Sequence, residues 1–230
     1  YAFGTREVAY VRHTSDVPVG FWRSIGHSIN AFVVESAIDE LALLAGVDPL
    51  LYRQRLLAGN AQALNVLNTA AQLAGWGTAP AKGHARGIAF SQGFGSTVAQ
   101  VVEIAGKAGN ISVVKVSCAI DCGTVINPDT VIAQMESGIV QGLGAALWGK
   151  MSFSNGTASP RNFNGYPMMR MGDMPQITTS VIASGGFIGG VGEPGVPPAA
   201  PALANAYAKL TGIPLPTLPM LTRASSGGDE

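Results

Sequence analysis

The chain has 230 residues and no net formal charge; 12% of its residues are charged, 47% are hydrophobic and 30 are glycines. This length provides one large or two small domains with enough material for a core. The balanced charge gives no electrostatic reason to bind nucleic acid or an anionic membrane, and no apolar run is long enough for a transmembrane helix. The charged share is about half that of ordinary soluble domains, so we expect other protein to cover much of the surface.

The first strand is expected at the start of the chain. Residues 1–14 are predicted to form it, with Val8 and Tyr10 set against Arg6 and Arg12. A turn-rich stretch then leads into the first helices.

A helical segment of about 28–75 follows, where apolar residues recur at steps of three and four, with helices predicted at about 28–46, 49–57 and 61–74. Ser28 or Asn30 is expected to cap the first helix, and Gly46 to end it. Asp48 is expected to cap the second helix, with Pro49 at its first position.

A mixed segment of about 82–222 follows, in which the spacing of the apolar residues changes from the helical period. The expected elements in order are strands within 86–106 and 110–123, a helix at 127–149, strands near 150–154 and 177–183, and a helix at 197–212. Asn127 is the expected cap of the first of these helices. This order predicts an α+β fold rather than a regular doubly wound one.

Glycines interrupt the predicted 127–149 helix at Gly138, Gly142 and Gly144. Each costs about 1 kcal/mol of helix propensity relative to alanine. We therefore expect another backbone or a ligand to approach the helix closely at these positions.

Neither the cysteines nor the histidines predict a metal site. Cys118 and Cys122 would share one face of a strand, roughly 13 Å apart, which is too far for a disulfide, and two cysteines cannot fill a four-ligand site. We expect both to be buried packing residues. His13, His27 and His84 show no zinc-binding spacing.

The stretch GGFIGGVGEPG, residues 185–195, holds six glycines and a single charge, Glu193. It does not fit a dinucleotide-binding loop, because a glutamate and a proline interrupt it and no acid follows about 20 residues later. Two interpretations remain: Glu193 caps the next helix, or it is a general base held rigidly against a bound group. The glycines exceed what one turn needs, which favours the base.

Gln134 and Arg23 are the other candidate binding residues. Gln134 is either an exposed glutamine or a neutral hydrogen-bonding group on a glycine-lined helix face. Arg23, within FWRSIGHS, is either an ion-pairing arginine or a planar fork of donors for an anionic or carbonyl oxygen. The residues alone leave both alternatives open.

Three stretches of the chain are informative together: VPVGFWRSIGHSINAFVVESAIDELALLAGVDPLLYRQRLL, AIDCGTVINPDTVIAQMESGIVQGLGAAL and GGVGEPGVPPAAPALANA. In this order they resemble the molybdenum-binding subunit of the xanthine oxidase family. The nearest match is to the isoquinoline 1-oxidoreductase and aldehyde dehydrogenase types. The resemblance covers nearly the whole chain. It implies that residues 1–230 are the C-terminal portion of a molybdopterin-binding domain.

The resemblance also implies roles for four residues. Glu193 would be the catalytic base, whereas Gln134, Arg23 and Gly192 would contact the cofactor, and this portion would supply no metal ligand. WRSIG stands where FRGFG is usual in xanthine oxidase, which argues against a purine substrate.

By the same resemblance, the cofactor is molybdopterin cytosine dinucleotide carrying molybdenum. The reaction is oxidative hydroxylation of an N-heteroaromatic compound or an aldehyde, with oxygen derived from water. The implied partners are the N-terminal portion of the molybdenum subunit, a small subunit with [2Fe–2S] clusters, and a cytochrome c acceptor. The alternative is a structural or partner-binding fragment without metal. The compartment stays open between cytoplasm and periplasm, with or without membrane attachment through a partner.

Overall fold

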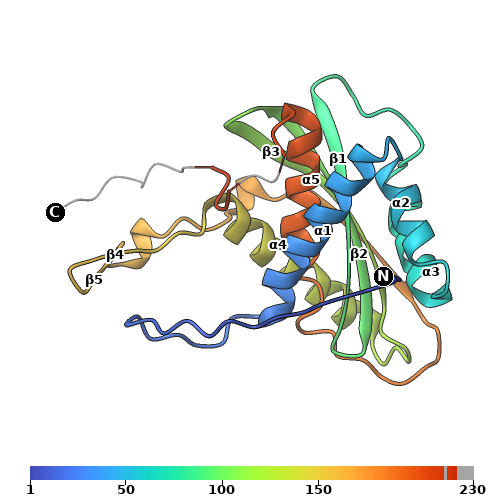
Figure 1. The fold of residues 1–230 in the computed structure, drawn as a ribbon, viewed down its shortest axis with the longest axis horizontal. Helices are drawn as coiled ribbons and strands as arrows, with labels where there is room; N and C mark the ends of the chain where they lie inside the picture. The colour runs from blue at the N-terminus through green and yellow to red at the C-terminus, as the bar shows by residue number, and fades with distance from the viewer. Residues whose placement is uncertain (215–216, 222–230) are drawn as a thin grey trace.

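The structure is a computed structural model that describes residues 1–214 and 217–221. The predicted end of the mixed segment, at about 222, lies outside these residues. Within them, five α-helices pack on a four-stranded sheet, and a small hairpin extends from this body (Figure 1). The predicted α+β class is confirmed.

The three helices of the first segment are α1 (Gly26–Leu44), α2 (Pro49–Leu56) and α3 (Ala61–Leu73). Asp48 caps α2 as predicted, because its carboxylate accepts two backbone N–H groups of the first turn. Gly46 follows α1 with φ +62°, as expected of a helix stop. The predicted caps Ser28 and Asn30 are wrong: both lie inside α1, whose N-cap Ile25 makes no side-chain cap.

The sheet has the order β1-β2-β3-β6, with strands β1 (His84–Gly93), β2 (Ser96–Lys107), β3 (Asn110–Asp121) and β6 (Gln176–Ile182). The first three form an antiparallel meander, and β6 pairs with β3 in parallel. The predicted stretch 86–106 therefore contains two strands. They are joined by a tight turn at Phe94 and Gly95, both with positive φ.

Two more helices belong to the mixed segment: α4 (Pro128–Trp148) and α5 (Ala199–Thr211). Asn127 caps α4 as predicted, accepting the N–H of Thr130 at 3.0 Å. The short strands β4 (Ser152–Ser154) and β5 (Thr157–Ser159) form the projecting hairpin. Only the first of them was expected.

Helices cover both faces of the sheet (Figure 1). α3 packs on one face against Ile88, Phe90 and other buried residues, whereas α4 and α5 pack on the opposite face in a larger apolar cluster. α5 crosses β1 so closely that a Cβ at Gly87 would lie 2.2 Å from the backbone nitrogen of Ala206. Only glycine allows this approach, which fixes α5 and the loop that precedes it against the sheet.

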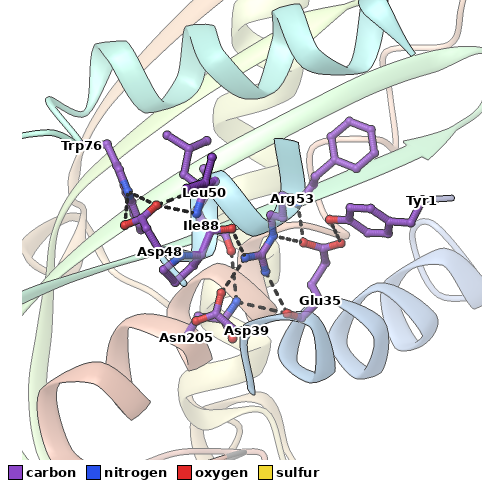
Figure 2. A network of polar contacts seen from close by, with 12 residues as sticks. Tyr1, Glu35, Asp39, Asp48, Leu50, Arg53, Trp76, Ile88 and Asn205 are labelled. Carbon is purple, nitrogen blue, oxygen red and sulfur yellow. Dashed lines mark hydrogen bonds and ion pairs between the residues drawn. The ribbon is translucent and has the colours of Figure 1, made fainter. Parts of the chain in front are cut away.

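A buried polar network joins α1, α2, β1 and α5 (Figure 2). The guanidinium of Arg53 donates to Glu35 at 2.9 Å and to Asp39 at 2.6 Å. The Tyr1 hydroxyl donates to the second carboxylate oxygen of Glu35. Asn205 donates to the backbone carbonyl of Ile88. The network fixes α1, and therefore the segment that immediately precedes it.

The predicted strand at 1–14 is wrong. No residue of this stretch is in a strand, and Val8 and Tyr10 are 94% and 86% exposed. A strand requires a hydrogen-bonded neighbour, and no described strand lies beside this one. The pattern itself was also weak, because these residues and Arg6 and Arg12 all occupy even positions and would share one face.

Cys118 and Cys122 are free thiols buried in the same apolar cluster, so the packing prediction is confirmed. Burial raises the pKa of Cys118 to about 12. Among the described residues, no helix combines the length and apolarity needed to span a bilayer.

Candidate functional site

The glycine-rich loop between β6 and α5 is held by four side chains from two distant parts of the chain. The carbonyl oxygens of Gly190, Gly192, Glu193 and Gly195 each accept a hydrogen bond from a side chain, and the donors are Ser96, Arg23, Ser24 and Gln100, respectively. The distances run from 2.6 to 2.7 Å. Because these donors come from β2 and the segment before α1, the loop has a defined path around Glu193.

Two of the loop glycines are needed because other backbone lies against them. A Cβ at Gly189 would lie 2.4 Å from the carbonyl oxygen of Gly95 in the β1–β2 turn. One at Gly195 would lie 3.3 Å from the backbone of Met135 in α4. Part of the glycine content that suggested a ligand therefore serves packing of the chain. A Cβ at Gly192, in contrast, would meet only the side chain of Gln134, at 4.0 Å.

The glycines of α4 show the same close approach from the opposite side. A Cβ at Gly138 would lie 3.0 Å from the backbone of Gly195, and one at Gly142 would lie 3.0 Å from the carbonyl oxygen of Val196. The prediction that another backbone approaches this helix is confirmed for these two positions. A Cβ at Gly144 would be 3.7 Å from Met169, an ordinary contact.

Arg23 contacts two of the three other predicted site residues, Gln134 and Gly192, and Glu193 directly follows Gly192. Its Nε donates to the Gly192 carbonyl at 2.7 Å, and its Nη2 donates to the Gln134 side-chain oxygen at 3.0 Å. Its Nη1 donates to the Ser137 hydroxyl at 2.9 Å and to the Gln141 side chain at 3.2 Å. The structure thus brings together positions separated by more than 100 residues.

Every acceptor of Arg23 is neutral. Among the described residues no carboxylate lies within ion-pair distance of its guanidinium, so the ion-pairing interpretation is not what the structure shows. Its donors are occupied by Gly192, Gln134, Ser137 and Gln141. Arg23 therefore orders its neighbours through hydrogen bonds to neutral groups rather than through an ion pair.

Glu193 is attached at two points to a single residue, Ser24. Its Oε1 accepts the backbone N–H of Ser24 at 3.1 Å, and its carbonyl accepts the Ser24 hydroxyl at 2.6 Å. The carbonyl also accepts the N–H of Val196 at the start of the turn into α5. Its side chain does not cap that helix, whose N-cap Pro198 has no side-chain cap.

Two polar groups of the cluster have no partner among the described residues: the Nε2 amide group of Gln134 and the Oε2 oxygen of Glu193. The orientation of the Gln134 amide is determined, because Arg23 can only donate and must face the amide oxygen. The cluster therefore offers one hydrogen-bond donor and one carboxylate oxygen beside the side-chain-free Gly192. These groups fit a cofactor that presents acceptor oxygens or sulfurs next to a proton-transfer site.

The part of the chain that the structure describes contains no group of three or more His, Cys, Asp or Glu side chains able to hold a metal ion. His27 instead packs against Phe94, with ring centroids 4.8 Å apart.

The sequence did not reveal Ser24, Gln100, Ser137 or Gln141 as parts of the site. Ser24 follows Arg23 directly, and Ser137 and Gln141 lie one and two turns beyond Gln134 on α4, so neighbourhood and helical spacing were the available signals. The signal for Gln100 was weaker: it is a polar residue in the middle of an apolar strand.

The sequence profile of the family described as "Molybdopterin cofactor-binding domain" matches residues 57–175. The chain is 36% identical, over 89% of its length, to the beta chain of isoquinoline 1-oxidoreductase from Brevundimonas diminuta. It is 30% identical, over 93% of its length, to one of the subunits of nicotinate dehydrogenase from Pseudomonas putida. It spans only 27% and 20%, respectively, of the length of these relatives.

Among solved structures, aldehyde oxidoreductase from Desulfovibrio gigas matches 87% of this chain and 40% of its own, with a TM-score of 0.67. The sequence identity is 13%, so the match shows a shared fold. Together with the family profile, these matches explain why the distant motifs meet in space. The chain belongs to the molybdopterin cofactor-binding domain family, in the group that includes molybdenum-binding subunits of the xanthine oxidase type.

Proposed function

We propose that this chain forms one wall of the active site of a molybdenum hydroxylase, with Glu193 as the general base and Gln134 and Gly192 at the cofactor. The observation that carries the proposal is the meeting of Glu193 and Gln134 in one cluster, each with a polar group that no described residue occupies. Both side chains are only partly buried, so these two groups are accessible to a bound molecule.

The fit to the cofactor follows from the chemistry of these groups. The Nε2 of Gln134 would donate a hydrogen bond to an acceptor on the bound molybdopterin, and Gly192 leaves room beside it. When bound, the molybdenum cofactor supplies two-electron oxidation at a centre that transfers water-derived oxygen to a substrate carbon.

The protein supplies positioning and proton transfer. Glu193 would accept the proton of the attacking oxygen nucleophile at Oε2, while the N–H of Ser24 holds Oε1 in place. The charge of Arg23, which makes no ion pair with a described carboxylate, favours negative charge nearby, and its hydrogen bonds keep the Gln134 amide in a single orientation. We propose that Arg23 acts through its neighbours rather than by contacting the cofactor, which revises its predicted role.

We also propose a substrate class, a form of the cofactor and a set of partners. The relatives' names suggest an N-heteroaromatic compound or an aldehyde as substrate, because those proteins are an isoquinoline oxidoreductase, a nicotinate dehydrogenase and a membrane-bound aldehyde dehydrogenase. We propose molybdopterin cytosine dinucleotide as the cofactor form. The proposed partners are the N-terminal portion of the molybdenum subunit, a small [2Fe–2S] subunit and a cytochrome c acceptor.

The test is Glu193→Gln in the complete enzyme, with Glu136→Gln as the matched control on an exposed position of α4. We expect Glu193→Gln to keep the molybdenum and pterin content while turnover falls by about 10²- to 10⁴-fold, the usual contribution of a positioned base. Isoquinoline, nicotinate and acetaldehyde serve as trial substrates. Stoichiometric molybdenum with near-normal turnover in Glu193→Gln would disprove the base. Absence of molybdenum from the intact unmodified complex would instead favour the structural-fragment alternative.

A further inference from the structure

Ser24 has an unusual backbone for a serine. Its φ is +73°, in the left-handed region that favours glycine, and the neighbouring Ile25 also has a positive φ of +44°. Ser24 is completely buried. A glycine would adopt this conformation without steric cost, so the serine side chain needs a reason to be there.

The contacts of Ser24 supply that reason. Its hydroxyl donates to the Glu193 carbonyl at 2.6 Å, and its N–H donates to the Glu193 carboxylate at 3.1 Å. One residue thus holds both the main chain and the side chain of Glu193. The two bonds fix the carboxylate relative to its own backbone, and Oε2 has no partner among the described residues.

We propose that Ser24 is a positioning residue for Glu193. Serine occupies this left-handed position because its hydroxyl holds Glu193, not because the turn requires a serine. The inference rests on the proposed role of Glu193 as the base. It concerns a residue that the family profile, which matches residues 57–175, does not cover.

The hydroxyl bond is not needed to satisfy the Glu193 carbonyl. That carbonyl also accepts the N–H of Val196 at 3.1 Å, so removal of the hydroxyl leaves no buried acceptor without a partner. The turn at Ser24 is likewise closed by backbone bonds, from Ile25 N–H to the Trp22 carbonyl and from His27 N–H to the Ser24 carbonyl. A role limited to folding would therefore be served equally well by glycine.

Two variants of the complete enzyme separate a role in positioning Glu193 from a role in folding of the turn. Ser24→Gly removes the hydroxyl and also relieves the left-handed strain, whereas Ser24→Ala removes the hydroxyl and keeps the strain. Both keep the backbone N–H. Asn155→Gly is the matched control, since Asn155 has a φ of +49° in the exposed β4–β5 turn, away from Glu193.

We expect both Ser24 variants to lower kcat on the order of tenfold with KM changed by less than about twofold, while the melting temperature of Ser24→Gly is at least that of Ser24→Ala. Hydrogen–deuterium exchange of a peptide covering residues 189–196 should rise in both variants and stay unchanged in Asn155→Gly. Parental kcat and exchange in Ser24→Gly would overturn the proposal.

The exchange measurement also tests the positioning role of Ser24 separately from the proposed function. If the unmodified enzyme turns over none of the trial substrates, the proposed function fails. Faster exchange of 189–196 in both Ser24 variants would then still support positioning of the loop by the hydroxyl, and unchanged exchange would reject it.

Discussion

Arg53 and Arg23 occupy two regions of the molecule that treat a positive charge in opposite ways. Arg53 is fully buried and lies against the carboxylates of Glu35 and Asp39 (Figure 2). Arg23 is half-buried and donates only to neutral groups of Gln134, Gly192, Ser137 and Gln141. In the first region the guanidinium is paired with carboxylates. In the second it binds only neutral groups, and the Gln134 amide group and one Glu193 carboxylate oxygen have no partner among the described residues.

The difference separates a polar cluster whose groups bind one another from a cluster that leaves groups free to bind another molecule. In the Arg53 network, burial and the nearby Glu35 raise the pKa of Tyr1 well above its usual range, so its hydroxyl stays a donor. Every atom there contributes to joining α1, α2, β1 and α5. The Arg23 cluster lies just before α1 and therefore depends on that network for its position.

The largest expected effect is on stability, from Arg53→Met. It leaves Glu35 and Asp39 without their cation, and we expect a loss of about 3–5 kcal/mol in the free energy of unfolding, the usual result of breaking a buried pair. Urea denaturation measures it. Arg23→Met is the comparison variant: its acceptors are neutral and partly reach water, so we expect it to cost less than half as much while turnover falls. Equal stability losses in the two variants would remove the distinction between the regions.

The next effect concerns the packing of α4 against the glycine-rich loop at residues 185–195. Gly138→Ala places a Cβ 3.0 Å from the backbone of Gly195, so the loop or α4 must move, and we expect a loss of about 1–3 kcal/mol together with reduced turnover. Gly144→Ala is the control on the same helix, where the nearest atoms are 3.7 Å away. It should be neutral or stabilise by up to about 1 kcal/mol through helix propensity. Thermal unfolding and kcat of both variants provide the check, and a Gly138→Ala variant as stable and active as Gly144→Ala would contradict the account.

The smallest effect comes from a third, more exposed cluster. Burial raises the pKa of Glu103, but hydrogen bonds from Arg86 and His84 outweigh it and hold the pKa below its ordinary value. Glu103 therefore adds stability that is fully present above about pH 5 and is lost as the pH falls through its lowered pKa. The stability difference between the parent and Glu103→Gln should be under about 1 kcal/mol and shrink at acid pH. A stability difference that grows as the pH falls would contradict the expectation that the ionised form of Glu103 stabilises the fold.

Local signals predicted the helices well, because caps and stops are properties of a few neighbouring residues. Asp48, Asn127 and Gly46 all act as expected. The strand at 1–14 failed because a strand is defined by its neighbour. The predicted caps Ser28 and Asn30 failed because α1 begins earlier, at Gly26, after Ser24, which is hydrogen-bonded to the distant Glu193.

The four site residues were identified from their resemblance to a family, and the structure shows the contacts that join them. No local pattern could have shown that Arg23 donates to both Gln134 and Gly192, which lie 111 and 169 residues away. The glycines were correctly expected to mark close approach, yet Gly189 and Gly195 are approached by protein backbone. Spacing alone cannot tell a ligand from another part of the chain.

The most direct test is an experimental structure of the complete enzyme with its cofactor bound. The account predicts that the molybdenum centre lies beside the Gln134 amide and the Glu193 carboxylate, with Arg23 and Ser24 still holding both residues as they do here. A cofactor bound elsewhere, or a Glu193 whose carboxylate faces away from it, would contradict the central claim.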